Sequence, residues 1–174
     1  RAIGTLVQPM GLAFDSSGNI FYVDQENHHV SRISQSGICL ARFGGWGNGP
    51  GKFQYPVSLQ LDRQDNVYVV DMNNQRIQKF SPDGEFILAF GDCVEEGQRL
   101  GMVFSSSIDN EDNLWIADTP HHRIQVYDPN GKLINSVTPN DWKNPDCICC
   151  LENAEYLVAD QSDNLIKRYN AGGN

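Results

Sequence analysis

The apolar and polar positions of this chain form a pattern that repeats along its length. When the segment that starts at Pro9 is laid over the segment that starts at Pro56, the two align without a gap, 47 residues apart. The same shift carries Asp24 to Asp71 and then to Asp118. A fixed period of this length indicates a protein built from structural repeats, each of which packs on its neighbours.

A fourth copy of the pattern begins near Pro145, after a connection that is five residues shorter, and Asp160 takes the place of Asp118 in it. The chain therefore contains four repeats, which cover approximately residues 9–55, 56–102, 103–144 and 145–174. We predict that they form a single domain over residues 1–174.

Each repeat contains four short apolar or alternating runs separated by turn residues. The second run, which is IFYVD, VYVVD, LWIAD or YLVAD, is almost wholly apolar and predicts a strand covered on both faces. The third run, which is VSRI, IQKF, IQVY or IKRY, alternates and predicts a strand with one more exposed face. The fourth run follows a turn that ends in Gly37, Gly84 or Gly131, where glycine supplies the positive φ of a tight turn. Four antiparallel strands per repeat predict an all-β fold, a β-propeller with four blades counted.

The residues of the repeat resemble a known family. The repeats read PMGLAFDSSGNIFYVDQENHHVSRI from Pro9, NVYVVDMNNQRIQKFSPDG from Asn66 and NLWIADTPHHRIQVYDPNG from Asn113, and the first connection contains GGWGNGPGKFQYP. This pattern resembles the NHL repeat over nearly the whole chain. The fourth copy departs from it, with Leu151 in place of the first aspartate and Asn164 in place of histidine. The resemblance implies an NHL-type β-propeller, which usually has six blades.

Four repeats are too few for such a ring of six. Residues 1–8 read as a fourth strand for the last repeat, so the amino terminus could complete that blade and close a four-bladed ring. The same pattern would also arise if the chain formed part of a larger, six-bladed ring. An incomplete ring would expose an apolar blade face at each end, and self-association is then expected.

Composition excludes several classes of partner. The formal net charge is -9, and nucleic-acid binding is therefore not expected, because phosphate contacts need clustered Lys and Arg side chains. No apolar stretch is long enough to span a membrane, and no intact signal peptide is visible. The odd count of five cysteines excludes a complete disulfide framework and favours a reducing, cytoplasmic compartment, although the sequence does not identify the compartment.

No recognisable catalytic or metal-binding motif is present. Cys147 and Cys150 have the spacing of a zinc-ligand pair, but no second pair accompanies them, so no metal and no cofactor are expected. Asp109, Glu111 and Asp112 lack the pattern of a calcium loop and are expected to be solvated turn charges. We predict no catalytic residues, and therefore a protein that is not an enzyme.

The repeated aspartate at the end of each second run is predicted to be structural. Asp24, Asp71, Asp118 and Asp160 could accept hydrogen bonds from the following loop or pair with an arginine such as Arg76 or Arg123 of the same repeat. The four histidines all lie in that loop and are expected to make a recurring local contact.

A candidate partner-binding face follows from the strand order. In a four-stranded antiparallel blade, the loop between strands two and three and the connection to the next blade emerge at the same end. The residues predicted to bind a partner there are His28, Trp46, Asn48, Tyr55, Asn73, Gln75, Arg99, His121, Trp142 and Lys143. For Trp46 and Trp142 the alternative is that the ring packs against a neighbouring blade. The opposite end of the blades, which carries tight acidic turns, is the second candidate for partner binding.

These observations favour a non-catalytic module that binds a protein partner. The resemblance supports this function, since similar NHL domains serve as recognition modules, for example in tripartite-motif ubiquitin ligases. One alternative is RNA binding, which some NHL propellers perform through a basic face. A second alternative is an enzyme of lyase or lactonase type, because similar propellers include an amidating lyase and calcium-dependent lactonases.

Overall fold

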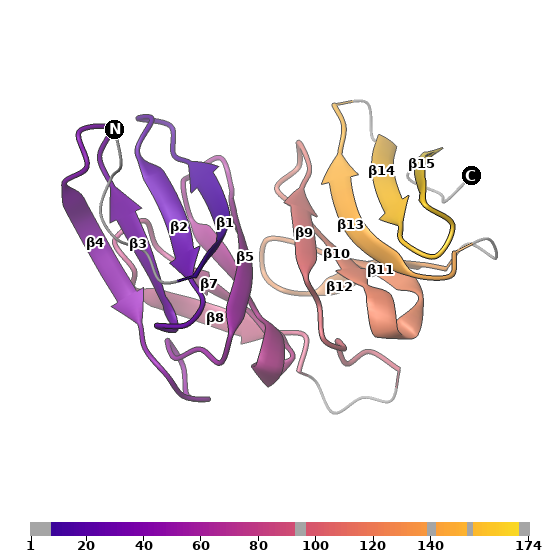
Figure 1. The fold of residues 1–174 in the computed structure, drawn as a ribbon, viewed down its shortest axis with the longest axis horizontal. Coiled ribbons are helices and arrows are strands. Elements are labelled where there is room, and N and C mark those ends of the chain that lie inside the picture. The colour runs from indigo at the N-terminus through magenta and orange to yellow at the C-terminus, as the bar shows by residue number, and fades with distance from the viewer. Residues whose placement is uncertain (1–7, 93–96, 139–141, 153–154, 171–174) are drawn as a thin grey trace. The chain divides into compact units, whose positions relative to one another are not determined.

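Short antiparallel strands account for almost all of the regular structure (Figure 1). The computed structural model describes residues 8–92, 97–138, 142–152 and 155–170. It divides into two compact units, residues 1–89 and residues 90–174. No helix in the described ranges has the length and apolar character needed to cross a membrane.

Unit 1 contains the first two blades, each with its strands in sequential order. Blade 1 consists of β1 (Pro9–Phe14), β2 (Ile20–Asp24), β3 (His29–Ile33) and β4 (Cys39–Gly44). Blade 2 consists of β5 (Pro56–Leu61), β6 (Val67–Asp71), the 3-10 turn η1 (Met72–Asn74), β7 (Arg76–Phe80) and β8 (Phe86–Phe90).

Unit 2 contains the other two blades. Blade 3 consists of β9 (Ser105–Ile108), β10 (Leu114–Asp118), the 3-10 turn η2 (Thr119–His121), β11 (Arg123–Tyr127) and β12 (Leu133–Val137). Blade 4 consists of β13 (Pro145–Cys150), β14 (Glu155–Asp160) and β15 (Leu165–Asn170). The all-β fold with four propeller blades is thus confirmed. The prediction that residues 1–8 complete blade 4 falls, except for Gln8, outside the described residues, and the single-domain prediction stays a prediction.

The turns have the backbone geometry that the glycines predict. Gly37, Gly84 and Gly131 have φ values of 89°, 90° and 77°, as the tight turn before each fourth strand requires. Within each middle hairpin the register brings the second strand's aspartate opposite the start of the third strand. Asp71 faces Arg76 in this way, and the same pairing recurs in blade 3.

Each unit has its own core, to which the second strands contribute more residues than any other strand position. In unit 1 the core contains Phe21, Val23, Val30, Phe53, Leu59, Val67, Val69 and Phe80. In unit 2 it contains Trp115, Ala117, Ile124, Val126, Trp142, Ile148, Tyr156, Val158 and Tyr169. All residues of β6 and β10 are buried, so the prediction of second strands covered on both faces is confirmed for blades 2 and 3.

The third strands differ from their prediction. Every residue of β7 is buried, and only the first residue of β11 is partly exposed, although both runs alternate between apolar and polar residues. The polar side chains are buried because they have partners: Gln78 Nε2 donates to the Lys52 carbonyl oxygen at 2.7 Å, and Lys79 Nζ lies 3.2 Å from Asp62 Oδ2. The expectation of a more exposed face was therefore wrong for blades 2 and 3.

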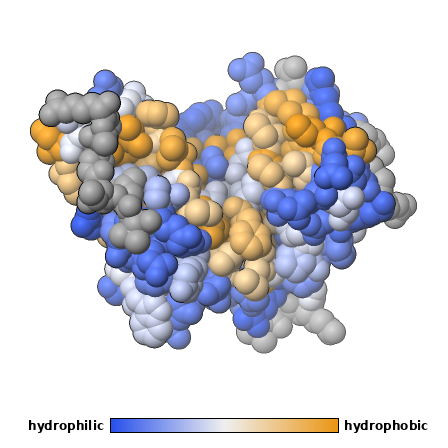
Figure 2. Space-filling view, in the orientation of Figure 1, coloured by the Kyte–Doolittle hydropathy of each residue, from blue (hydrophilic) through white to orange (hydrophobic). Residues whose placement is uncertain are grey.

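Blade 1 presents apolar side chains on its first strand. Met10, Leu12 and Phe14 alternate along β1 and are exposed, whereas Val57 and Leu59 at the equivalent positions of β5 are buried. Figure 2 shows such apolar surface, in orange, on both units. Within the described part of unit 1, this side of β1 has no sheet packed over it, because β5 packs on the other side of the blade.

Candidate functional site

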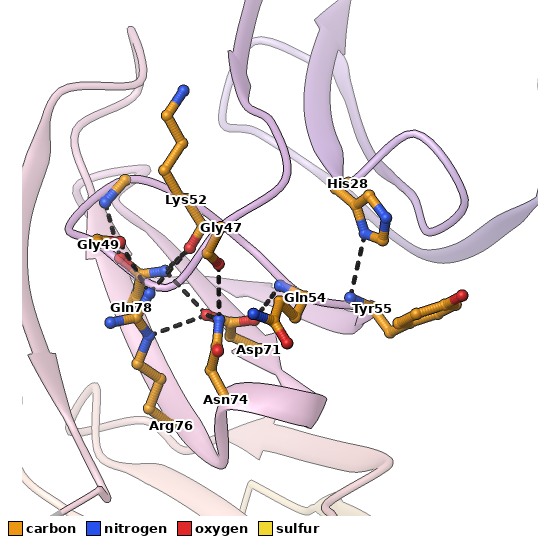
Figure 3. Close-up of polar contacts among 11 residues, drawn as sticks. His28, Gly47, Gly49, Lys52, Gln54, Tyr55, Asp71, Asn74, Arg76 and Gln78 are labelled. Atoms are coloured by element: carbon orange, nitrogen blue, oxygen red, sulfur yellow. Dashed lines mark hydrogen bonds and ion pairs between the residues drawn. The ribbon is translucent and has the colours of Figure 1, made fainter.

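The repeated aspartate organises one end of blade 2 and the connection that precedes it, where five of the ten predicted binding residues lie. Asp71 Oδ2 accepts hydrogen bonds from Asn74 Nδ2 at 2.8 Å, Arg76 Nε at 2.9 Å and Gln78 Nε2 at 3.1 Å (Figure 3). Its other oxygen, Oδ1, accepts the backbone N–H of Gln54 at 2.7 Å. Burial raises the pKa of Asp71, while the hydrogen bonds from Gln54, Asn74 and Arg76 oppose that rise.

The same cluster holds the connection between the two blades of unit 1. Arg76 Nη2 donates to the carbonyl oxygens of Gly49 and Lys52, both at 2.9 Å, and Asn74 Nδ2 donates to that of Gly47 at 3.0 Å. The predicted ion pair between Asp71 and Arg76 is confirmed. Together these hydrogen bonds fix residues 45–55 against the β6–β7 loop.

The arrangement recurs within unit 2. Asp118 accepts Arg123 Nε at 2.8 Å, His121 Nδ1 at 2.9 Å and the Gly101 N–H at 3.0 Å. Arg123 then donates from Nη2 to the Arg99 carbonyl at 2.8 Å and from Nη1 to the Gly97 carbonyl. The second predicted pair, Asp118 with Arg123, is therefore also confirmed.

Blade 4 achieves the same result with lysine. Asp160 accepts the backbone N–H groups of Lys143 at 3.0 Å and Asn144 at 3.1 Å, and Lys167 Nζ lies 3.2 Å from its Oδ2. Burial raises the pKa of Asp160, but these hydrogen bonds outweigh it and lower the pKa to about 2. In blades 2, 3 and 4 the aspartate binds an N–H group 17 residues earlier in the chain, so the contact belongs to the repeat.

The glycine-rich connection places Trp46 at the surface. Gly44 has a φ of 114°, and a Cβ there would lie 2.7 Å from the ring of Phe53, which is fully buried beneath it. Trp46 pairs with Phe53 in a short parallel bridge, and the Gly47 N–H donates to the Phe53 carbonyl at 3.0 Å. Trp46 is 71% exposed on this hydrogen-bonded segment.

His28 and Tyr55 join the two loops of unit 1. The Tyr55 backbone N–H donates to His28 Nδ1 at 3.2 Å, and the two rings meet edge to face with centroids 5.1 Å apart (Figure 3). Because Nδ1 is an acceptor here, the neutral ring carries its proton on Nε2. Both residues have left-handed backbone conformations, with φ values of 55° and 52°.

Six of the predicted binding residues lie on these bonded loops of unit 1. Trp46, Asn48, Tyr55 and Asn73 are exposed, and His28 and Gln75 are partly exposed. We call these six residues the Trp46 surface. They come from the β2–β3 loop, the β6–β7 loop and the connection over residues 45–55.

The other four predicted residues belong to unit 2, and one of them was misplaced. Arg99, His121 and Lys143 are exposed, although His121 is bound to Asp118 and Lys143 Nζ lies 2.8 Å from Asp163 Oδ1. Trp142 is only 5% exposed. Its ring packs edge to face on Tyr169 and Tyr156, at centroid distances of 5.3 and 6.5 Å, so it contributes to the core and cannot serve as an exposed contact.

The acidic turns at the opposite end are not simply solvated. Asp112 is buried, and Asp109 accepts hydrogen bonds from two backbone N–H groups, from Asn113 and from the Trp115 indole. The expectation of solvated turn charges was therefore wrong for these two residues, because their carboxylates close the β9–β10 turn or lie inside the unit. Glu111 is exposed, as expected.

Of the cysteines that the structure describes, Cys39 lies exposed in β4 and the other three lie in β13. Cys147 and Cys149 are exposed, and burial raises the pKa of Cys150 to about 12. Its thiol is therefore protonated at neutral pH. In the ranges that the structure describes, no three His, Cys, Asp or Glu side chains lie close enough together to hold a metal ion.

Comparison with known proteins identifies the repeat. The family model described as the NHL repeat matches residues 53–80 and 107–127. The chain contains NHL repeats. The first matched segment includes the hairpin with Asp71 and Arg76, and the second includes the equivalent hairpin with Asp118 and Arg123. No curated protein matches the chain in sequence.

Solved structures with the same fold have diverse titles. A streptogramin B lyase is 16% identical with a TM-score of 0.72, over 93% of this chain and 54% of that one. A catalytically inactive virginiamycin B lyase from Staphylococcus aureus with quinupristin is 16% identical with a TM-score of 0.71, over 93% of this chain and 55% of that one. The WD40 repeats of RRP9 are 10% identical with a TM-score of 0.74, over 96% of this chain and 52% of that one. The NHL-repeat chain thus spans about half the length of these structures, and the likeness concerns the fold.

Proposed function

We propose that this NHL-repeat chain is a non-catalytic module that recognises a protein partner through the Trp46 surface. The observation that carries the proposal is the position of Trp46, a large aromatic side chain that is 71% exposed on a segment held by partly buried hydrogen bonds. Exposed aromatic side chains on rigid loops are typical anchors of protein interfaces.

The hydrogen bonds from Asn74 and Arg76 to residues 45–55 reduce the conformational entropy that this surface loses on binding. A flexible loop loses conformational freedom when it binds, which weakens affinity. Arg76 and Asn74 already fix the carbonyl groups of the Trp46 segment in the free protein. The Trp46 ring can therefore contact a partner without the backbone part of that cost.

The residues around Trp46 supply polar contacts. Asn48, Asn73 and Gln75 have side-chain amides, which both donate and accept hydrogen bonds, and Tyr55 adds a second aromatic ring. Arg99, His121 and Lys143 occupy the corresponding loops of unit 2, and we propose them as further partner contacts. With a net charge of -9, the chain is better suited to a protein than to RNA.

Replacing Trp46 with alanine tests the proposal. Partners are captured from lysate by wild-type protein, and the affinity of each is then measured against the Trp46→Ala variant. We expect a loss of about 30-fold, which corresponds to about 2 kcal/mol at an anchor position, with no change in melting temperature. The matched control is Ile87→Ala, because Ile87 is also an exposed apolar residue of unit 1 but lies on β8.

Two results would contradict the proposal. Equal binding by wild-type protein and the Trp46→Ala variant would remove Trp46 from the interface. Tight RNA binding that weakens steeply with salt would instead favour the nucleic-acid alternative.

A further inference from the structure

A second aspartate recurs in the repeats, at the turn between the first and second strands. Asp15, Asp62 and Asp109 lie 47 residues apart and make the same local contacts. Each accepts the backbone N–H groups two and four residues later, at 2.7 to 3.0 Å, and the side-chain amide of the asparagine four residues later, at 2.9 to 3.1 Å. The backbone therefore presents this carboxylate in the same way in blades 1, 2 and 3.

In blades 1 and 2 a cation from the third strand binds this carboxylate. Arg32 Nη2 lies 2.6 Å from Asp15 Oδ2, and the guanidinium stands 5.5 Å from the centre of the Phe21 ring. In blade 2, Lys79 Nζ lies 3.2 Å from Asp62 Oδ2 and 4.7 Å from the centre of the Tyr68 ring. Each blade thus places its own cation between a carboxylate and an aromatic ring, which is a favourable site for a positive charge.

Blade 3 keeps the carboxylate and the aromatic ring but lacks the cation. Trp115 occupies the position of Tyr68, and its indole N–H donates to Asp109 Oδ2 at 2.8 Å. Val126 occupies the position of Lys79, and in the part of unit 2 that the structure describes no Lys or Arg side chain pairs with Asp109. A pocket of about 320 Å³ lies here, lined by Asp109, Trp115 and Val126 among others.

The remaining walls of the pocket suit the same kind of ligand. Ile134 and Leu151 add apolar surface, on which the carbon chain of a long cationic side chain can pack. Glu111 and Glu152 add carboxylates at the wall. Glu155 also lines the pocket, but Arg168 already pairs with it.

We propose that this pocket of blade 3 binds a Lys or Arg side chain of a partner protein, which takes the place that Arg32 and Lys79 fill in blades 1 and 2. An ion pair in a partly open pocket contributes little affinity by itself. The cation must therefore be delivered by a protein that makes further contacts. The site shares no residue with the Trp46 surface, since all the residues that line the pocket come from unit 2.

The full chain can be titrated with N-acetyl-lysine methylamide and N-acetyl-arginine methylamide. The indole N–H resonance of Trp115 reports binding by NMR, because that group touches Asp109 directly. We expect a saturable shift in the millimolar range, and at least tenfold weaker binding of the neutral analogue N-acetyl-norleucine methylamide. The Trp46→Ala variant serves as a control and should bind the lysine probe as the wild type does, whatever the fate of the proposed function.

Two substitutions test the comparison between blades. Val126→Lys supplies blade 3 with an internal cation, and we expect it to abolish binding of the lysine probe. Asp109→Asn removes the charge but keeps the size of the side chain, and we expect at least tenfold weaker binding. The second variant decides the matter if the first does not fold.

The reciprocal change is Lys79→Val, which should open an equivalent site beside Asp62. We expect a second saturable shift for the lysine probe, now at the ring resonances of Tyr68.

Three outcomes would overturn the proposal. They are equal binding of the norleucine analogue, retention of lysine binding by folded Val126→Lys or Asp109→Asn, and no shift of the Trp115 indole with either cationic probe. Tighter binding of free cadaverine than of the capped lysine would overturn the assignment to a partner protein.

Discussion

The two ends of the blades use the same chemistry for different purposes. At one end, Asp71, Asp118 and Asp160 each pair with a cation and also bind the backbone of the preceding connection. At the other end, Asp15 and Asp62 pair with a cation, but their remaining contacts lie mainly within one turn. The first kind of contact fixes the connection that precedes a blade, whereas the second completes one hairpin.

This difference explains which contact varies between repeats. Loss of the cation at the connecting end would weaken the attachment of a whole segment, since Arg76 donates to two carbonyl groups of residues 45–55. Loss of the cation at the other end leaves the turn intact, as blade 3 demonstrates with Val126. The second position is therefore the one at which a repeat can change its chemistry and keep its fold.

The largest expected effect is at the connecting end. Arg76→Ala leaves the buried Asp71 without its cation and removes two hydrogen bonds to the backbone of residues 45–55, so we expect the free energy of unfolding to fall by about 3 kcal/mol. Lys79→Ala also leaves a buried carboxylate, Asp62, without its cation, but the turn at Asp62 keeps its own hydrogen bonds, so it should cost less, about 2 kcal/mol. The exposed Arg168→Ala should cost less than about 0.5 kcal/mol. Urea unfolding of the three variants measures the order, and equal losses at Arg76 and Lys79 would erase the distinction between the two ends.

The next effect is a dependence of stability on pH. The pKa of Asp160 in the folded protein is about 2, below its ordinary value of 3.8, so its ionised form stabilises the fold. This contribution, about 2 kcal/mol, is fully present above about pH 4 and is lost as the pH falls toward 2. Unfolding free energies between pH 2 and 6 should therefore change less steeply in Asp160→Asn than in the wild type. Identical slopes would show that Asp160 does not carry this linkage.

The smallest effect concerns the loop between second and third strands. Gln75 has a φ of 54°, a conformation that glycine adopts readily and β-branched residues avoid. Gln75→Gly should change stability by less than about 0.5 kcal/mol, whereas Gln75→Val should lower it by about 1 to 2 kcal/mol. Thermal unfolding compares the two, with the same pair of changes at His122 in blade 3 as a control.

Much of this fold could be predicted because it repeats. A shift of 47 residues aligns the strands, the turn glycines and the aspartates, and the Asp71–Arg76 pair follows from the recurrence of both residues in the third copy as Asp118 and Arg123. Two features could not be read from the pattern of polarity. Gln78 is polar but buried, because its partners are backbone carbonyl and carboxylate oxygens from other segments. Trp142 is buried because two tyrosines of later strands pack on it.

The pocket of blade 3 was missed although a signal existed. The alignment already sets Val126 beside Arg32 and Lys79, and Asp109 beside Asp15 and Asp62. The sequence therefore already shows that blade 3 lacks the cation. It does not reveal that the space stays open, because that depends on how closely the neighbouring strands pack.

The left-handed position in each middle loop has a consequence for how such a protein can change its partner. His28, Gln75, His122 and Asn164 occupy this position, with φ values between 51° and 55°. The hairpin dictates the backbone there, so four loops of one shape carry three kinds of side chain. A single substitution at this position can alter what a loop displays while the loop itself is preserved. Each blade thus has one loop position at which a substitution can change binding specificity while the fold is preserved.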